Sequence, residues 1–102
     1  MDQDGPGNFS VASDVANDRV TVTVTGEVDM ATADAMFGAA TPHGVEAATL
    51  DLRAVTFFDS AAIHALIRLA ERYPGSLDVI PSAQVQRVLD ISGLSGQPWL
   101  KA

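Results

Sequence analysis

Segment 48–67 constrains the fold most, because it predicts a buried strand, a short loop and a helix in ATLDLRAVTFFDSAAIHALI. The helix opens at Asp59 and Ser60, where the first backbone N–H groups have no partner inside the helix. Negative charge is favourable there, since the helix dipole and the free N–H groups both attract an anion. Ser60 can therefore carry a phosphate without breaking the fold, which makes it the first candidate for a functional switch.

The remaining sequence alternates predicted strands and helices. The strands are expected at 9–15, 19–25, 48–52 and 77–80, and the helices at 30–40, 59–72 and 82–92. The alternation in RVTVTVT and the turn at 16–18 predict an antiparallel hairpin whose second strand ends at Gly26. Residues 95–102 are expected to be irregular or a short strand. The order β-β-α-β-α-β-α predicts an α/β fold, a mixed sheet with helices mainly on one face.

Each predicted helix has an apolar face. The apolar face of the first helix consists of Met30, Ala33, Phe37 and Ala40. That of the second helix consists of Ile63, Leu66, Ile67 and Ala70. His64, Arg68, Glu71 and Arg72 form an exposed polar stripe on the second helix. The third helix has Val85, Val88 and Leu89 as its apolar seam, and Gly93 followed by Leu94 is typical of a left-handed helix stop.

Size and composition indicate a single globular domain. The chain has 102 residues, of which 47% are hydrophobic and 19% charged. It has no cysteine, which excludes disulfides, thiolate catalysis and cysteine-based metal sites. Residues 1–7 are polar and predict a flexible tail rather than a secretory signal, and no apolar run approaches the roughly 20 residues of a membrane span. We therefore expect a soluble, cytoplasmic protein.

The net charge of −7 is concentrated near the N-terminus, where seven acids and one base precede residue 35. Such a surface repels phosphate backbones and anionic lipid, which argues against nucleic acid and membrane partners. A basic protein surface is the partner that this charge favours. The alternative is that the acids only confer solubility.

Three separated blocks resemble the STAS domain family of bacterial anti-sigma factor antagonists. They are TGEVD with ATA at 25–33, LDLRAVTFFDS at 50–60 and PSAQVQRVLDISGL at 81–94. Their order and spacing identify residues 8–102 as a single STAS domain. The resemblance implies a cytoplasmic protein of transcription regulation, such as stress response, without a cofactor, metal or catalytic activity.

By that resemblance Ser60 corresponds to the serine that is phosphorylated in the family. The partner would be an anti-sigma factor, often a serine kinase, which phosphorylates the antagonist and switches it off. The expected partner-binding residues lie around this serine: Glu27, Asp29, Thr32, Asp59, Ser60, Ala61, Ala62 and His64.

The chain departs from the family pattern at two places. Ala61 and Ala62 stand where the family has Ser or Thr and then Gly. The chain also stops at Ala102, where the family continues into a final strand and helix. We therefore expect a sheet that is partly uncovered near Trp99 and Leu100.

Three other interpretations remain open from the sequence. Asp59 and Ser60 can be a helix cap without any further role. A STAS adaptor subunit that binds the ATPase of a bacterial lipid-transport ABC complex is the second functional reading, and small proteins of that group tend to have Ala where Ala61 stands. A hydrolase using Ser60 and His64 is disfavoured, because the chain has no Gly-x-Ser-x-Gly elbow.

His43 and His64 lack metal-ligand spacing, and there is no phosphate-binding Gly-rich loop.

Overall fold

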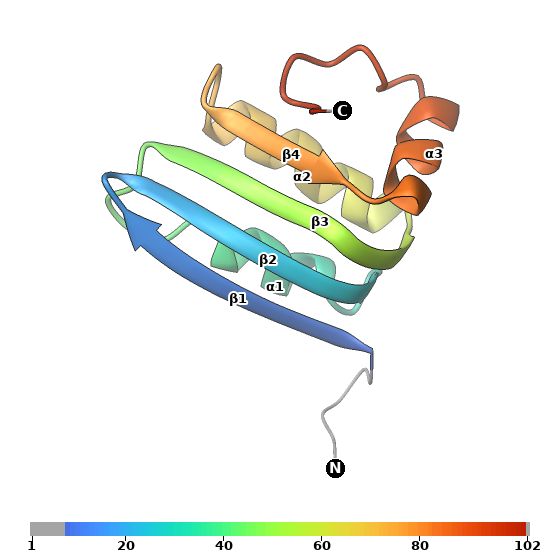
Figure 1. Cartoon of the computed structure of the whole chain (residues 1–102), viewed down its shortest axis with the longest axis horizontal. Helices are drawn as coiled ribbons and strands as arrows, with labels where there is room; N and C mark the ends of the chain where they lie inside the picture. The colour runs from blue at the N-terminus through green and yellow to red at the C-terminus, as the bar shows by residue number, and fades with distance from the viewer. Residues whose placement is uncertain (1–7, 102) are drawn as a thin grey trace.

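The computed structural model describes residues 8–101, so the predicted tail at 1–7 lies outside the described residues. Figure 1 shows one sheet with helices α1 and α2 behind it and α3 at the end of the later strands. The elements in chain order are β1 Phe9–Ala16, β2 Arg19–Val28, α1 Ala33–Ala39, β3 Ala47–Phe58, α2 Ser60–Arg72, β4 Leu77–Pro81 and α3 Ala83–Ile91.

The sheet has the order β1-β2-β3-β4. β1 pairs with β2 antiparallel, and the β2–β3 and β3–β4 pairs are parallel. The predicted α/β class, element order and mixed sheet are therefore confirmed. Parallel neighbours need a crossover, and here α1 and α2 supply it on the same face of the sheet (Figure 1).

The first two strands form the predicted hairpin. Its turn consists of Asn17 and Asp18, which both have positive φ angles of 55° and 65°. Two such residues give a turn whose twist matches that of the strands, and Asn and Asp tolerate this conformation. In β2, Val20, Val22 and Val24 are fully buried against the helices while the threonines between them are exposed. Strict alternation thus produced a half-buried strand, as predicted.

The second and third strands are longer than predicted. β2 runs past Gly26 to Val28, and β3 continues from Leu52 to Phe58 through residues that we expected to form a loop. The parallel ladder has irregular register at Thr23/Thr25 and at Gly26/Glu27, so the alternation breaks although the pairing continues. Gly26 has a φ of 95°, and a Cβ there would lie 1.8 Å from the Asn8 oxygen. Glycine therefore marks a bulge and a close approach to Asn8, just before β1, and not a strand end.

The first helix is shorter than predicted. It begins at Ala33 instead of Met30, and Met30 is 84% exposed instead of packing in the core. The reason is local, because the Asp29 carbonyl accepts from the N–H groups of Thr32 and Ala33 and closes a turn first. The prediction that Met30 shares the apolar face of this helix was wrong.

Helix α2 has its predicted bounds, with Asp59 as the N-cap, but a rotated buried face. The side chains that are buried are Ala62, Ala65, Leu66 and Leu69. Of the predicted set, Ile63 and Ala70 are half-buried, and Ile67 is 37% exposed. The buried face is thus centred on Ala62, Ala65, Leu66 and Leu69, and Ile67 lies at its exposed margin. The predicted polar stripe from His64 to Arg72 is exposed.

Helix α3 ends as predicted. Gly93 has a φ of 78°, and the Leu94 N–H donates to the Leu89 carbonyl at 2.8 Å, as in a Schellman stop. Val85 and Leu89 are fully buried and Val88 is half-buried. The N-cap Ser82 also donates its hydroxyl to the Val55 carbonyl at 2.7 Å, which ties α3 to β3.

The C-terminal segment covers the outer edge of β4, contrary to our expectation of an uncovered sheet. Val79 N–H donates to the Trp99 carbonyl, and Lys101 N–H donates to the Val79 carbonyl, both at 2.8 Å. Trp99 is only 8% exposed, and Leu100 forms a single parallel bridge to Val79. The segment is otherwise irregular.

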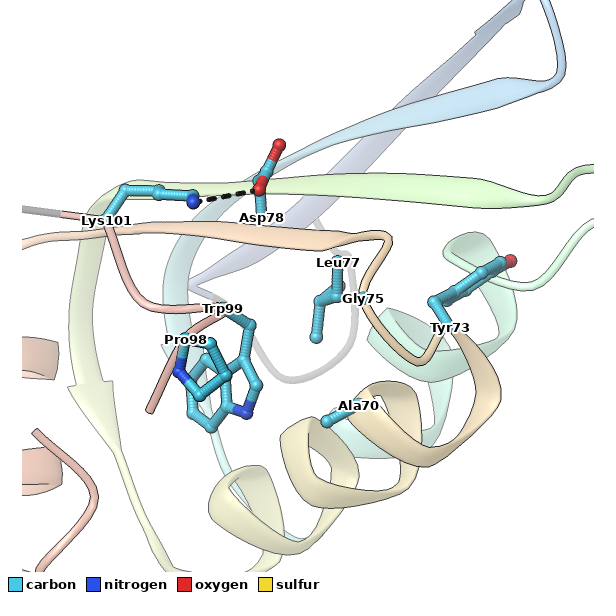
Figure 2. Close-up of a pocket in the computed structure, with 8 residues that line it drawn as sticks. All are labelled: Ala70, Tyr73, Gly75, Leu77, Asp78, Pro98, Trp99 and Lys101. Atoms are coloured by element: carbon cyan, nitrogen blue, oxygen red, sulfur yellow. Dashed lines mark ion pairs between the residues drawn. The ribbon is translucent and has the colours of Figure 1, made fainter. Parts of the chain in front are cut away.

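Beside this segment lies a small cavity of about 110 Å³ (Figure 2). Trp99, Leu77 and Ala70 border it, and the Lys101–Asp78 ion pair of 3.4 Å lies beside it. The Tyr73 side chain points away from Trp99, and its hydroxyl donates to the Ala40 carbonyl at the end of α1 over 2.6 Å. That bond joins α1 to α2 inside the core.

Candidate functional site

The candidate site lies at the end of the sheet where β2 and β3 terminate and α2 begins (right-hand end in Figure 1). The Asp59 N–H donates to the Val28 carbonyl at 3.3 Å, which joins the start of α2 to the end of β2. Two segments far apart in the sequence, 27–32 and 59–64, therefore meet at this edge.

Asp59 builds the start of α2. Its Oδ1 accepts hydrogen bonds from the Ala61 N–H at 2.9 Å and the Ala62 N–H at 3.1 Å. The backbone of Asp59 is extended, with φ −106° and ψ −169°, as an N-cap requires. The carboxylate thus already uses two of the N–H groups that we expected to face an incoming anion.

Ser60 is the first residue of α2 and its side chain is exposed. Because the side chain is exposed, a second protein can reach the hydroxyl. A phosphate here would benefit from the dipole of the 13-residue helix but would lie next to the Asp59 carboxylate.

Asp29 organises the loop after β2. Its Oδ1 accepts from the Ala31 N–H at 2.9 Å and lies 3.2 Å from the Thr32 hydroxyl. The Thr32 hydroxyl in turn accepts from the Asp29 N–H at 2.9 Å and lies 3.1 Å from the Glu27 carbonyl. These bonds hold the loop in one shape and leave the Asp29 side chain half-buried at the surface.

The eight predicted contact residues divide by exposure. Ser60 and His64 are exposed, and four residues are half-buried: Glu27, Asp29, Asp59 and Ala61. Thr32 is 2% exposed and Ala62 is fully buried, so their side chains shape the surface instead of touching a partner. His64 lies one helical turn after Ser60 on the exposed side of α2.

Two large apolar side chains, Phe57 and Met30, are exposed at this edge, and sequence reasoning did not identify Phe57 as part of the site. Phe57 is 45% exposed and pairs with Glu27 across the β2–β3 ladder, and Met30 follows Asp29 in the loop. Large apolar groups beside acids are typical of protein-binding surfaces. The signal for Phe57 was its place next to Phe58, because consecutive strand residues point to opposite faces and only one can enter the core.

The geometry does not form a hydrolytic triad. The Asp59 carboxylate bonds to the backbone of its own helix, and no hydrogen bond to His64 is present among residues 8–101. Within the same residues, no group of three His, Cys, Asp or Glu side chains could hold a metal ion. Over that part of the chain, no helix is both long and apolar enough to cross a membrane.

Comparisons with known proteins define the family to which this fold belongs. The family model described as "Mlab, STAS domain" matches residues 11–101. The chain belongs to the STAS domain family. A search of curated proteins finds no significant sequence match.

Three solved structures are similar in fold. An anti-sigma factor antagonist from Mycobacterium paratuberculosis is 25% identical with a TM-score of 0.78, over 96% of this chain and 89% of that one. The anti-sigma factor antagonist SpoIIAA in its unphosphorylated form is 18% identical with a TM-score of 0.64, over 91% and 85%. An anti-sigma factor antagonist STAS domain from Rhodobacter sphaeroides is 15% identical with a TM-score of 0.57, over 78% and 92%.

Proposed function

We propose that this protein is an anti-sigma factor antagonist that acts by binding and is switched off by phosphorylation of Ser60. The observation that carries the proposal is an exposed serine at the first position of α2, directly after an acidic cap. The 25% identity to a solved anti-sigma factor antagonist, over nearly the whole chain, supports the same class. We propose that the partner is an anti-sigma factor in the cytoplasm and that this anti-sigma factor is a serine kinase.

The proposed contact surface combines the loop after β2 with the start of α2. It offers carboxylates from Glu27 and Asp29 beside the apolar groups of Met30 and Phe57. A partner with a basic rim and an apolar pocket fits this surface.

Phosphorylation would act on the interface and leave the fold intact. A phosphoserine adds about −1.5 to −2 charge, which the Asp59 carboxylate repels. The helix dipole offsets roughly 0.3–1 kcal/mol of this repulsion. In an interface shaped for a hydroxyl, burying that charge costs about 2–5 kcal/mol. Affinity would fall by roughly 30-fold to several thousand-fold.

Affinity capture from the native host tests the proposal, with wild type, Ser60→Ala and Ser60→Asp as baits and mass spectrometry as the readout. We expect wild type and Ser60→Ala to capture a kinase-fold anti-sigma factor. Ser60→Asp should not capture it. Ser95→Asp is the matched control, because it adds the same charge in an exposed segment after α3. Loss of the partner with both Asp variants would attribute the effect to net charge and contradict the switch.

A second candidate is the adaptor subunit of a lipid-transport ABC complex, which Ala61 after Ser60 favours. An ABC ATPase captured equally by all baits would support it, and Ser60 would then be only the start of a helix. A melting temperature of Ser60→Asp many degrees below wild type would also contradict the switch model.

Asp29 gives a test of the loop. We expect Asp29→Ala to weaken partner binding while the domain stays folded, because the carboxylate shapes the loop and faces the partner. Asp29→Asn keeps an acceptor for the Ala31 N–H and removes only the charge, so titration calorimetry on both variants separates shape from charge. Unchanged affinity in both would remove Asp29 from the interface.

A further inference from the structure

We propose that this protein self-associates through the outer edge of β1, which pairs antiparallel with the same edge of a second copy. β1 forms one border of the sheet, as Figure 1 shows. Within residues 8–101 no element pairs with its outer side, whereas the C-terminal segment covers the opposite border at β4. Unpaired N–H and C=O groups on an edge strand are a template for another strand.

The composition of β1 does not protect this edge. Its sequence FSVASDVA has no proline, no lysine, no glycine and a single charge, Asp14. Natural edge strands are usually blunted by prolines, lysines, bulges or a short length. Here eight residues pair with β2 in unbroken register, so the outer edge is long and regular.

The direction of the free backbone groups follows from the hairpin. Asn8 accepts from the Glu27 N–H, which makes Asn8 and Glu27 a hydrogen-bonded pair. In an antiparallel ladder such pairs alternate, so every second residue faces β2. The residues between them direct their N–H and C=O groups outward: Phe9, Val11, Ser13 and Val15.

One two-fold register uses all four outward residues. It places Phe9 opposite Val15 of the second copy, Val11 opposite Ser13 of the second copy, and Ala12 opposite itself on the axis. Asp14 then meets Ser10 of the second copy, so no like charges face each other. Moving the axis to Ser13 would put Phe9 opposite the turn residue Asn17 and lose its bonds.

The same register covers exposed apolar surface. The side chains of Val11 and Val15 lie on the helix side of the sheet, because their partners Val24 and Val20 are buried there. Val15 is nevertheless 54% exposed. Phe9 of the second copy would lie against it, and an aromatic group opposite a β-branched one is a favourable cross-strand pair.

A cysteine trap tests the register, because the native chain has no cysteine. In the proposed dimer the Ala12 Cα atoms are about 4.5 Å apart, within the range that a disulfide can bridge. Ser10→Cys is the matched control, since it lies on the same strand and face but about 13 Å from its symmetry mate. We expect mild oxidation to cross-link Ala12→Cys and to leave Ser10→Cys monomeric.

Sedimentation equilibrium on the full chain measures the association itself, over about 10 µM to 1 mM, the range of weak interfaces. We expect a reversible dimer that tightens with salt, because screening reduces repulsion between two chains of net charge −7. Ser13→Pro removes one outward N–H per chain and should weaken dimerisation about 30-fold, the loss of two hydrogen bonds. Circular dichroism checks that this variant folds.

Two results would overturn the proposal. One is a monomer across the whole concentration range at high salt, together with no cross-linking of Ala12→Cys. The other is equal cross-linking of Ala12→Cys and Ser10→Cys, which would mean random collision and not a defined edge pairing. The cysteine comparison decides the question if Ser13→Pro does not fold.

Discussion

Replacing Asp59 by alanine tests how the start of α2 is held. The carboxylate accepts two backbone N–H groups at 2.9 and 3.1 Å, and alanine leaves both without that acceptor. Removing an N-cap acceptor costs about 1–2 kcal/mol. For a domain near 100 residues that corresponds to a fall in melting temperature of roughly 4–8 °C per kcal/mol.

Asparagine at position 59 separates the hydrogen bonds from the charge. It can accept the same two bonds, and caps with Asn and Asp are about equally stable. Only the attraction between the carboxylate and the helix dipole is lost, which is roughly 0.3–1 kcal/mol. We therefore expect Asp59→Asn to lie much closer to wild type than Asp59→Ala.

Urea unfolding followed by the fluorescence of Trp99 is the measurement, since this is the only tryptophan and is 8% exposed. The wild-type and variant midpoints give the differences in free energy of unfolding. An alanine midpoint equal to wild type would show that the cap contributes nothing. Equal losses in both variants would assign the effect to charge and refute the argument from hydrogen bonds.

Three further predictions concern the fold. Gly26→Ala should lower the free energy of unfolding by about 3 kcal/mol or more, because φ is 95° and the new Cβ would meet the backbone of Asn8, just before β1. Gly38→Ala, in α1 with open space around it, should instead stabilise by about 0.5–1 kcal/mol, and thermal melting of both variants checks the pair. The Arg53 hydrogen bond lowers the pKa of Asp51, so its stabilisation is present above the unfolded pKa of about 3.9 and lost as the pH falls through the lower native pKa. Asp51→Asn should therefore cost less than about 1 kcal/mol at neutral pH and nothing in acid, and a constant difference from pH 2 to 7 would contradict this. Tyr73→Phe leaves a buried carbonyl without its 2.6 Å donor and should cost about 1–3 kcal/mol in urea unfolding, whereas a stability equal to wild type would mean that this bond adds nothing.

The site was predictable where its signals are local. Asp59 and Ser60 were placed at the helix start by the change from an apolar strand to an acid and a hydroxyl, and the structure has Asp59 as the N-cap. The roles of Thr32 and Ala62 were not predictable in this way. Whether a side chain near a site touches a partner or the core depends on which elements pack over it, and both residues proved to be buried.

The sequence by itself determined the β1–β2 hairpin, the bounds of α2 and the glycine stop of α3, because each depends on residues within a few positions of one another. Tertiary structure decided the length of β2 and β3, whose parallel pairing continues through bulges that interrupt the alternation. It also decided the rotation of α2 and the burial of Trp99. Long-range contacts set these features, since a buried face is defined by the surface against which it packs, and no local pattern contains that surface.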